Sequence, residues 1–217
     1  MLPPKKKLLT PQLILYTLVC CAAALTPLAL GWVTEWRRPA VWLLTVLAYR
    51  WIEQSGFTAS PERGPRKGEW IFYGIYLGLS GSILLPAVEF AYIQRTFSMG
   101  LLLLGLAIAA FGTWVRYQMV TTLGAALSTH VEIRPGQKLV DHGICRYIRH
   151  PGYAGVLLFT IGAALILDAR YSLGYIFLFF VPMIAMRIIV EERDNAENLA
   201  GYREYMQRSK KLIPYIF

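Results

Sequence analysis

Long apolar stretches recur along this chain of 217 residues, and short polar turns separate them. About 20 apolar residues suffice to cross the ~30 Å hydrocarbon core of a bilayer as a helix. With 56% hydrophobic residues and a mean hydropathy of +0.44, the sequence is too apolar for an ordinary soluble domain. We therefore predict an all-α, polytopic membrane protein with about six transmembrane helices, at 13–33, 39–52, 70–93, 99–119, 153–167 and 173–190. Five is the alternative, because 39–52 is short and could lie at the interface.

The basic residues indicate how these helices are oriented. The net charge is +9, from 22 Lys and Arg against 13 Asp and Glu. With the amino terminus in the cytoplasm, most basic residues fall on the cytoplasmic side, and only Arg37, Arg38, Arg95 and Arg170 fall outside. This predicts that both termini and the polar segment 120–150 are cytoplasmic. The pattern does not separate a prokaryotic inner membrane from the endoplasmic reticulum, and we favour the former. The excess charge indicates contact with anionic lipids and argues against a nucleic-acid partner.

We expect one integrated domain with two functional parts. Residues 1–95 would be transmembrane helices that shape a pocket or mediate oligomerisation. Residues 96–217 would be the functional core, with a polar loop at 120–155, a tight hairpin at 168–172 and an amphipathic helix after Glu191. The chain has only three cysteines, and their spacing fits neither a disulfide framework nor a zinc site, so no metal is expected.

The most polar, turn-rich segment is 139–155, directly before the fifth apolar stretch. Its centre is Arg149-His150-Pro151. Pro151 disfavours the α conformation at His150 and suits the first turn of a following helix. Arg149 and His150 would then sit at a helix amino terminus, which can hold an anionic or polar ligand group. The alternative is a basic loop that only contacts lipid phosphates.

A second polar cluster closes the last apolar stretch, where Arg187 follows an almost unbroken apolar run. An ionisable residue at such depth is costly and usually faces a partner or a wet cavity. Arg187 and Glu191 are four residues apart and share one helix face, so they could pair with each other or grip a substrate. Because 153–190 forms a hairpin, we expect this cluster to return to the face that bears Arg149 and His150, and to line one cavity with them.

These two blocks together resemble the isoprenylcysteine carboxyl methyltransferase family. The resemblance rests on Arg-His-Pro-x-Tyr-x-Gly at 149–155, on Arg-x-x-x-Glu-Glu at 187–192 and on the later Tyr202 and Tyr205. Related membrane methyltransferases that act on phospholipids and thiols share parts of the pattern, which covers about residues 100–215. The chain departs from the family pattern at Cys145, where an aromatic residue is usual, and at Gln137-Lys138, where a His is frequent.

The resemblance implies a membrane enzyme that uses S-adenosylmethionine to methylate a lipophilic acceptor, with the active site on the cytoplasmic side. The acceptor would enter from the bilayer. Arg187 would orient it as the catalytic residue, and Tyr202 would also contact it. The implied cofactor-binding residues are Leu139, Val140, Gly143, Arg149, His150, Pro151, Tyr153 and Glu191.

Several alternatives stay open at this point. The acceptor could be a phospholipid amine or a thiol in place of an isoprenylcysteine carboxylate. A membrane reductase of sterol type with a nicotinamide cofactor is a second possibility, since such reductases share late-chain features. A non-enzymatic scaffold that binds anionic lipid is a third. The sequence sets no oligomeric state.

Overall fold

The computed structural model describes residues 11–31, 34–56, 69–93, 98–124 and 137–212. It is all-helical over these ranges, apart from one isolated bridge between Ile148 and Lys210. The helices are α1 (Pro11–Ala29), α2 (Arg37–Gly56), α3 (Glu69–Tyr92), α4 (Met99–Leu123), α5 (Pro151–Ile166), α6 (Arg170–Tyr175), α7 (Val181–Asn198) and α8 (Tyr202–Arg208). A short 3₁₀ turn, η2, spans Gly143–Arg146, and a π-helical turn, η3, spans Ile176–Phe180.

Three of the described helices are long and apolar enough to cross a membrane, namely Trp70–Tyr92, Met99–Leu123 and the continuous helix Arg170–Asn198. Two shorter apolar helices cover Ile14–Pro27 and Pro151–Ile166. The chain is therefore a multi-pass membrane protein, as predicted, and the count of six spans stays a prediction. The cytoplasmic orientation also stays a prediction, and several residues behind it, including Arg63, Arg95 and Arg134, lie outside the described ranges.

The first, second and last helices depart from the predicted ranges. α1 ends at Ala29, two residues after Pro27, and not at residue 33. α2 is longer than predicted, from Arg37 to Gly56. The last helix runs on to Asn198, so Glu191 lies in the middle of α7 and not in a separate amphipathic tail helix. Hydropathy marks where the bilayer ends, whereas Glu, Arg and Ala are good helix formers that continue the backbone hydrogen bonds beyond it.

Glycines set how closely the helices pack. A methyl group added at Gly112 would lie 2.5 Å from the backbone nitrogen of Phe159, and one at Gly162 would lie 2.4 Å from that of Ala109. The backbones of α4 and α5 are thus in direct contact. On α3, Gly78 lies against the ring of Phe180. Gly74 and Gly81 lie against the side chains of Met183 and Tyr175, which belong to the same continuous last helix.

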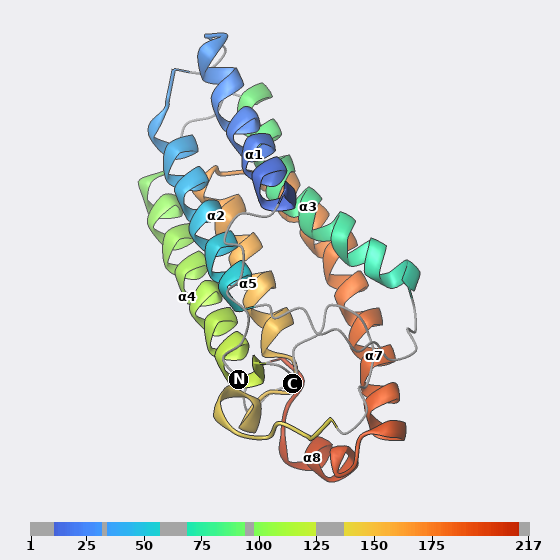
Figure 1. Ribbon diagram of the computed structural model, residues 1–217. Coiled ribbons are helices and arrows are strands. Elements are labelled where there is room, and N and C mark those ends of the chain that lie inside the picture. Colours follow the sequence, from blue (N-terminus) through green and yellow to red (C-terminus); the bar gives the residue numbers. More distant parts are fainter. Residues whose placement is uncertain (1–10, 32–33, 57–68, 94–97, 125–136, 213–217) are drawn as a thin grey trace.

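The buried core draws on both halves of the chain. Trp42, Tyr49 and Ile83 pack in one cluster with Phe159 and Phe180. α5 lies between α2 and the last helix (Figure 1) and has many buried residues, although it spans only 16 residues. The π-helical turn precedes Pro182, where the missing N–H and the ring would otherwise disturb a regular α-helix. α5, α7 and α8 converge at one end of the bundle, with the turn before α5 (Figure 1).

Candidate active site

The turn at His150 places the amino end of α5. Pro151 is the first residue of α5, as the sequence predicted, and His150 precedes it in a non-helical conformation. The His150 carbonyl accepts hydrogen bonds from the backbone N–H groups of Tyr153 and Ala154, both at 3.2 Å. The side chain of His150 is buried, and its ring lies 5.8 Å from that of Tyr153.

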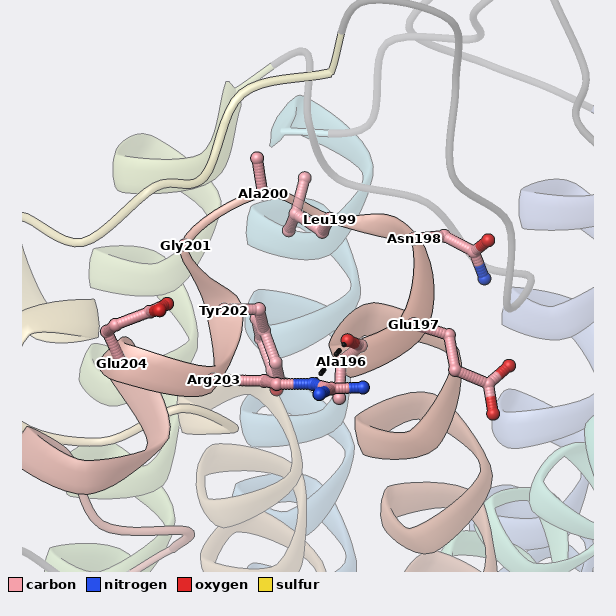
Figure 2. Close-up of a pocket in the computed structure, with 9 residues that line it drawn as sticks. All are labelled: Ala196, Glu197, Asn198, Leu199, Ala200, Gly201, Tyr202, Arg203 and Glu204. Atoms are coloured by element: carbon pink, nitrogen blue, oxygen red, sulfur yellow. Dashed lines mark hydrogen bonds between the residues drawn. The ribbon is translucent and has the colours of Figure 1, made fainter.

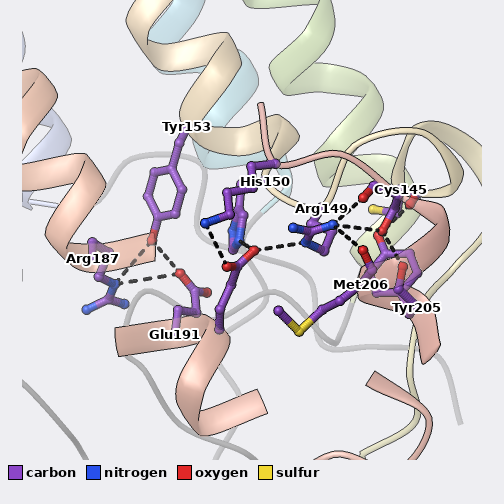
Figure 3. Close-up of polar contacts among 11 residues, drawn as sticks. Cys145, Arg149, His150, Tyr153, Arg187, Glu191, Tyr205 and Met206 are labelled. Atoms are coloured by element: carbon purple, nitrogen blue, oxygen red, sulfur yellow. Dashed lines mark hydrogen bonds and ion pairs between the residues drawn. The ribbon is translucent and has the colours of Figure 1, made fainter. Parts of the chain in front are cut away.

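Tyr153 joins the two predicted blocks. Its hydroxyl accepts a hydrogen bond from Arg187 Nε at 3.1 Å and donates one to Glu191 Oε2 at 2.8 Å. Arg187 and Glu191 share a face of α7, as predicted, but their closest ionic contact is 3.9 Å. The tyrosine hydroxyl therefore sits between the guanidinium and the carboxylate (Figure 3). The Arg187 side chain is 5% exposed and that of Glu191 is 28% exposed, so the carboxylate is the more accessible partner.

Arg149 and His150 face Glu192, the other residue of the Glu-Glu pair. Arg149 Nε lies 2.8 Å from Glu192 Oε1, and His150 Nε2 lies 3.3 Å from the same oxygen. Lys211 Nζ lies 3.3 Å from Glu192 Oε2. Side chains of Arg149, His150 and Glu192 are all less than 10% exposed. A buried carboxylate thus gathers basic groups from the turn and from the C-terminal segment.

The segment after α8 is tied back to this turn. Arg149 donates its backbone N–H to Lys210 O at 2.7 Å, His150 donates to Lys211 O at 3.0 Å, and Lys210 donates to Tyr147 O at 3.0 Å. Arg149 Nη1 donates to the carbonyls of Met206 and Ser209. Neither the contacts of Glu192 nor those of residues 209–211 are predictable from the sequence, because their partners in the turn lie at least 42 residues away along the chain. The one usable signal was the second Glu in the pair.

A further contact holds η2 against α8. The Tyr205 hydroxyl donates to the carbonyl of Cys145. Cys145 is 2% exposed, and burial raises the pKa of its thiol to about 11. Gly143 has φ +57°, and a methyl group there would lie 2.7 Å from Thr122 Oγ1 at the end of α4. Gly143 therefore supports a tight turn beside α4, which favours glycine at this position.

The predicted residues Leu139, Val140 and Tyr202 lie nearer the junction of α7 and α8. Leu139 and Val140 are half-buried, and Leu139 Cδ2 lies 3.7 Å from where a methyl group on Gly201 would be. Tyr202 is buried, which raises the pKa of its hydroxyl to about 12. It lines a pocket of about 280 Å³ formed by residues 196–204 (Figure 2).

The structure thus brings the two predicted clusters together at one end of the bundle. Two neighbouring residues of α7 make the contacts between the clusters. Glu191 binds Tyr153, and Glu192 binds Arg149 and His150. The pocket at 196–204 does not include Arg187 or His150, so the cavity predicted between these two stays a prediction. Within the described ranges, no three His, Cys, Asp or Glu side chains are placed to hold a metal ion.

The second half of the chain matches known proteins. Residues 103–197 match the isoprenylcysteine carboxyl methyltransferase (ICMT) family. A probable protein-S-isoprenylcysteine O-methyltransferase of rice (Oryza sativa subsp. indica) is 30% identical over 115 residues, which are 52% of this chain and 60% of the rice protein. Protein-S-isoprenylcysteine O-methyltransferase B of Arabidopsis thaliana is 28% identical over 115 residues, or 52% and 58% of the two chains.

Two more distant similarities were found. The uncharacterised protein YpbQ of Bacillus subtilis is 30% identical over 79 residues, which are 36% of this chain and 47% of that protein. The solved structure of the eukaryotic intramembrane Ras methyltransferase ICMT superposes with a TM-score of 0.49 at 20% identity, over 95% of this chain and 88% of that one. The matched part of this chain covers only about six tenths of the length of the plant relatives.

Proposed function

We propose that the chain is an integral membrane methyltransferase of the isoprenylcysteine carboxyl methyltransferase family, whose pattern residues 103–197 match. The proposed reaction transfers a methyl group from S-adenosylmethionine to the carboxylate of a prenylated cysteine. The observation that carries the proposal is the Tyr153 hydroxyl, which links Arg187 to Glu191. It unites the Arg-His-Pro-x-Tyr block with the Arg-x-x-x-Glu block, the two parts on which the resemblance depends.

The residues present suit this cofactor and acceptor. Glu191 keeps about a quarter of its side chain exposed, so its carboxylate can accept hydrogen bonds from the cofactor's polar groups. Leu139 and Val140 are half-buried and offer apolar surface at the same end of the bundle, whereas Pro151 is buried. S-adenosylmethionine supplies a methyl group bound to a positively charged sulfur. We propose that Glu191 and the neutral Tyr153 hydroxyl hold the cofactor, and that Gly143, Arg149 and His150 form the supporting turn.

Arg187 would orient the acceptor. Its guanidinium is buried, and a planar guanidinium can hold a carboxylate through two parallel hydrogen bonds. A carboxylate is already ionised at neutral pH, so it needs no general base to become a nucleophile. The opposite charges of donor and acceptor cancel as the methyl group moves, and a site that excludes water favours that step. The chain's contribution is then mainly alignment of the two reactants.

We place the site on the cytoplasmic side, in a prokaryotic inner membrane. Support comes from the basic residues of the described segments 137–151 and 193–211, which lie at the same end of the bundle as Glu191. The acceptor's lipid tail would stay among the transmembrane helices, while the water-soluble cofactor would reach Glu191 from the cytoplasm. Tyr202, in the pocket beside α8, would contact the polar part of the acceptor.

The test uses the purified full chain in lipid nanodiscs. Labelled adenosylmethionine should bind saturably and NADPH should not, and N-acetyl-S-farnesylcysteine should gain one methyl ester per turnover. Binding of NADPH alone would indicate a reductase, and binding of neither cofactor would leave a lipid-binding scaffold. If adenosylmethionine binds but the prenylcysteine is not methylated, a panel of phospholipid amines and lipophilic thiols identifies the acceptor.

A further inference from the structure

A buried cluster of charges lies outside the site, at the neighbouring ends of α2 and α4. Glu53 Oε1 accepts from Arg116 Nε at 2.8 Å and lies 2.6 Å from Arg116 Nη2, so two nitrogens of the guanidinium contact one carboxylate oxygen. Arg50 Nη1 contacts the other oxygen, Glu53 Oε2, at 3.1 Å. The side chain of Glu53 is 9% exposed and that of Arg116 is 15% exposed.

Glu53 comes from the part of the chain that precedes the family match at 103–197, whereas Arg116 lies within it. Two neighbours of Glu53 on α2 strengthen this junction. The guanidinium of Arg50 lies 4.6 Å from the centre of the Tyr16 ring, and Tyr49 stacks on Phe159 of α5 with ring centres 3.8 Å apart. The amino-terminal helices are therefore joined to α4 and α5 by polar and aromatic contacts as well as by apolar packing.

On the side away from Glu53, Arg116 packs against the first turn of α5. A methyl group added at Gly152 would lie 2.6 Å from Arg116 Nη1, and one at Gly155 would lie 2.9 Å from the Arg116 backbone nitrogen. The guanidinium thus occupies the space between the Glu53 carboxylate and the backbone of Gly152. Gly152 is bonded directly to Tyr153, whose hydroxyl meets Arg187 and Glu191.

Replacing the Glu53 carboxylate by an amide would leave the Arg116 charge buried without the negative charge that neutralises it. Such a charge is strongly disfavoured and moves toward water or toward another acceptor. Since the guanidinium fills the space against Gly152, its movement would release or displace the first turn of α5. Alignment of donor and acceptor is sensitive to shifts of about 1 Å.

We propose that Glu53 is a positioning residue for the methyl-transfer site. By holding Arg116 against Gly152, Glu53 fixes the first turn of α5 and with it the position and rotation of the Tyr153 side chain. This inference rests on the proposed function. It assigns to the amino-terminal helices a role in aligning the reactants, in addition to any part in shaping the acceptor pocket.

The test compares Glu53→Gln with Glu89→Gln in the full chain in nanodiscs. Glu89 is the matched control, because its carboxylate also links two helices, accepting from Ser172 N and Oγ at 2.8 Å, but at the opposite end of the bundle. We expect Glu53→Gln to lower kcat at least about tenfold, with adenosylmethionine affinity changed less than about threefold. Glu89→Gln should keep kcat within about twofold at a comparable loss of thermal stability.

The variant Gly152→Ala displaces the same guanidinium from its other side and removes no charge. If Glu53 acts through this contact, its effect on kcat and that of Gly152→Ala are not additive, and the double variant is only slightly worse than either single one. Should Glu53→Gln fail to fold, Gly152→Ala alone decides, and an unchanged kcat overturns the proposal. Equal kcat losses in Glu53→Gln and Glu89→Gln also overturn it, whereas an inactive wild-type chain would refute the proposed function itself.

Discussion

Arg187 donates to the hydroxyl of Tyr153 across 3.1 Å, although the two residues are 34 positions apart and belong to different helices. The same hydroxyl donates to Glu191 at 2.8 Å, so one phenol separates a buried cation from a partly exposed carboxylate. The direct ion pair between the two charges is long, at 3.9 Å from Arg187 Nε to Glu191 Oε2. The shorter contacts of both side chains therefore run through the phenol.

Tyr153→Phe removes this hydroxyl and little volume. We expect Arg187 and Glu191 to pair directly, and kcat to fall about tenfold to a hundredfold while the fold is kept. The measurement is methyl-transfer kinetics on purified protein. Tyr147→Phe serves as a control because Tyr147 is 51% exposed, and it should change kcat by less than about twofold. Equal activity of the Tyr153 variant and wild type would contradict the role given to this hydroxyl.

Arg187→Ala and Glu191→Ala should separate the two binding roles. Loss of Arg187 should abolish turnover while adenosylmethionine still binds, since the guanidinium would hold the acceptor. Loss of Glu191 should chiefly weaken adenosylmethionine binding, by about tenfold or more, because a charged hydrogen-bond acceptor contributes about 1.5–3 kcal/mol. Equilibrium binding and single-turnover kinetics distinguish the two effects. The reverse pattern would exchange the assignments.

Glu192→Gln tests the stability of the turn. The substitution removes a carboxylate that contacts both Arg149 and Lys211, and it leaves the Arg149 charge buried. We expect the free energy of unfolding to fall by about 3–5 kcal/mol, measured by denaturant titration in micelles. Asp141→Asn is the matched control: Asp141 pairs with Arg208, but both side chains are exposed, so the loss should stay below about 1 kcal/mol.

Gly112→Ala tests the direct contact between α4 and α5. The added methyl group would lie 2.5 Å from the backbone nitrogen of Phe159 and 2.7 Å from the carbonyl oxygen of Gly155, so the helices must move apart. Overpacking of this kind costs about 1–3 kcal/mol. Gly174→Ala is the control, since nothing lies within 4 Å of its added methyl group. A thermal melt should show a lower Tm for the first variant and an equal or higher Tm for the second.

Cys145 should resist alkylation in the folded protein. Its thiol has a pKa of about 11, above the usual ~8.5, so at pH 8 the reactive thiolate is on the order of a hundredfold scarcer than in a free cysteine. Burial slows the reagent further. Peptide mapping after iodoacetamide treatment should show little label at pH 8, a rate that rises about tenfold per pH unit up to about pH 11, and rapid labelling after denaturation. Prompt labelling at pH 8 would show that η2 opens.

The sequence was sufficient for what periodicity and local chemistry determine. It predicted that Pro151 lies in the first turn of a helix, that Arg187 and Glu191 share a face, and that the last helix returns to the loop. It could not predict that Glu192 binds Arg149, that residues 209–211 pair with 147–150, or that Glu53 meets Arg116. Those contacts depend on how separate helices are placed, and no local pattern encodes their distance. α7 continues to Asn198, beyond the predicted end at 190, because hydropathy falls there while the residues remain good helix formers.

The brevity of α5 sets the depth at which chemistry can occur. Sixteen residues rise only about 24 Å, less than the ~30 Å of hydrocarbon that a spanning helix must cross. Because α5 packs between other helices, we expect this shortfall to place its polar amino end below the level of the lipid headgroups rather than to thin the bilayer. In the proposed reaction, a lipidated acceptor would then reach Arg187 while its tail remains in the hydrocarbon core of the bilayer.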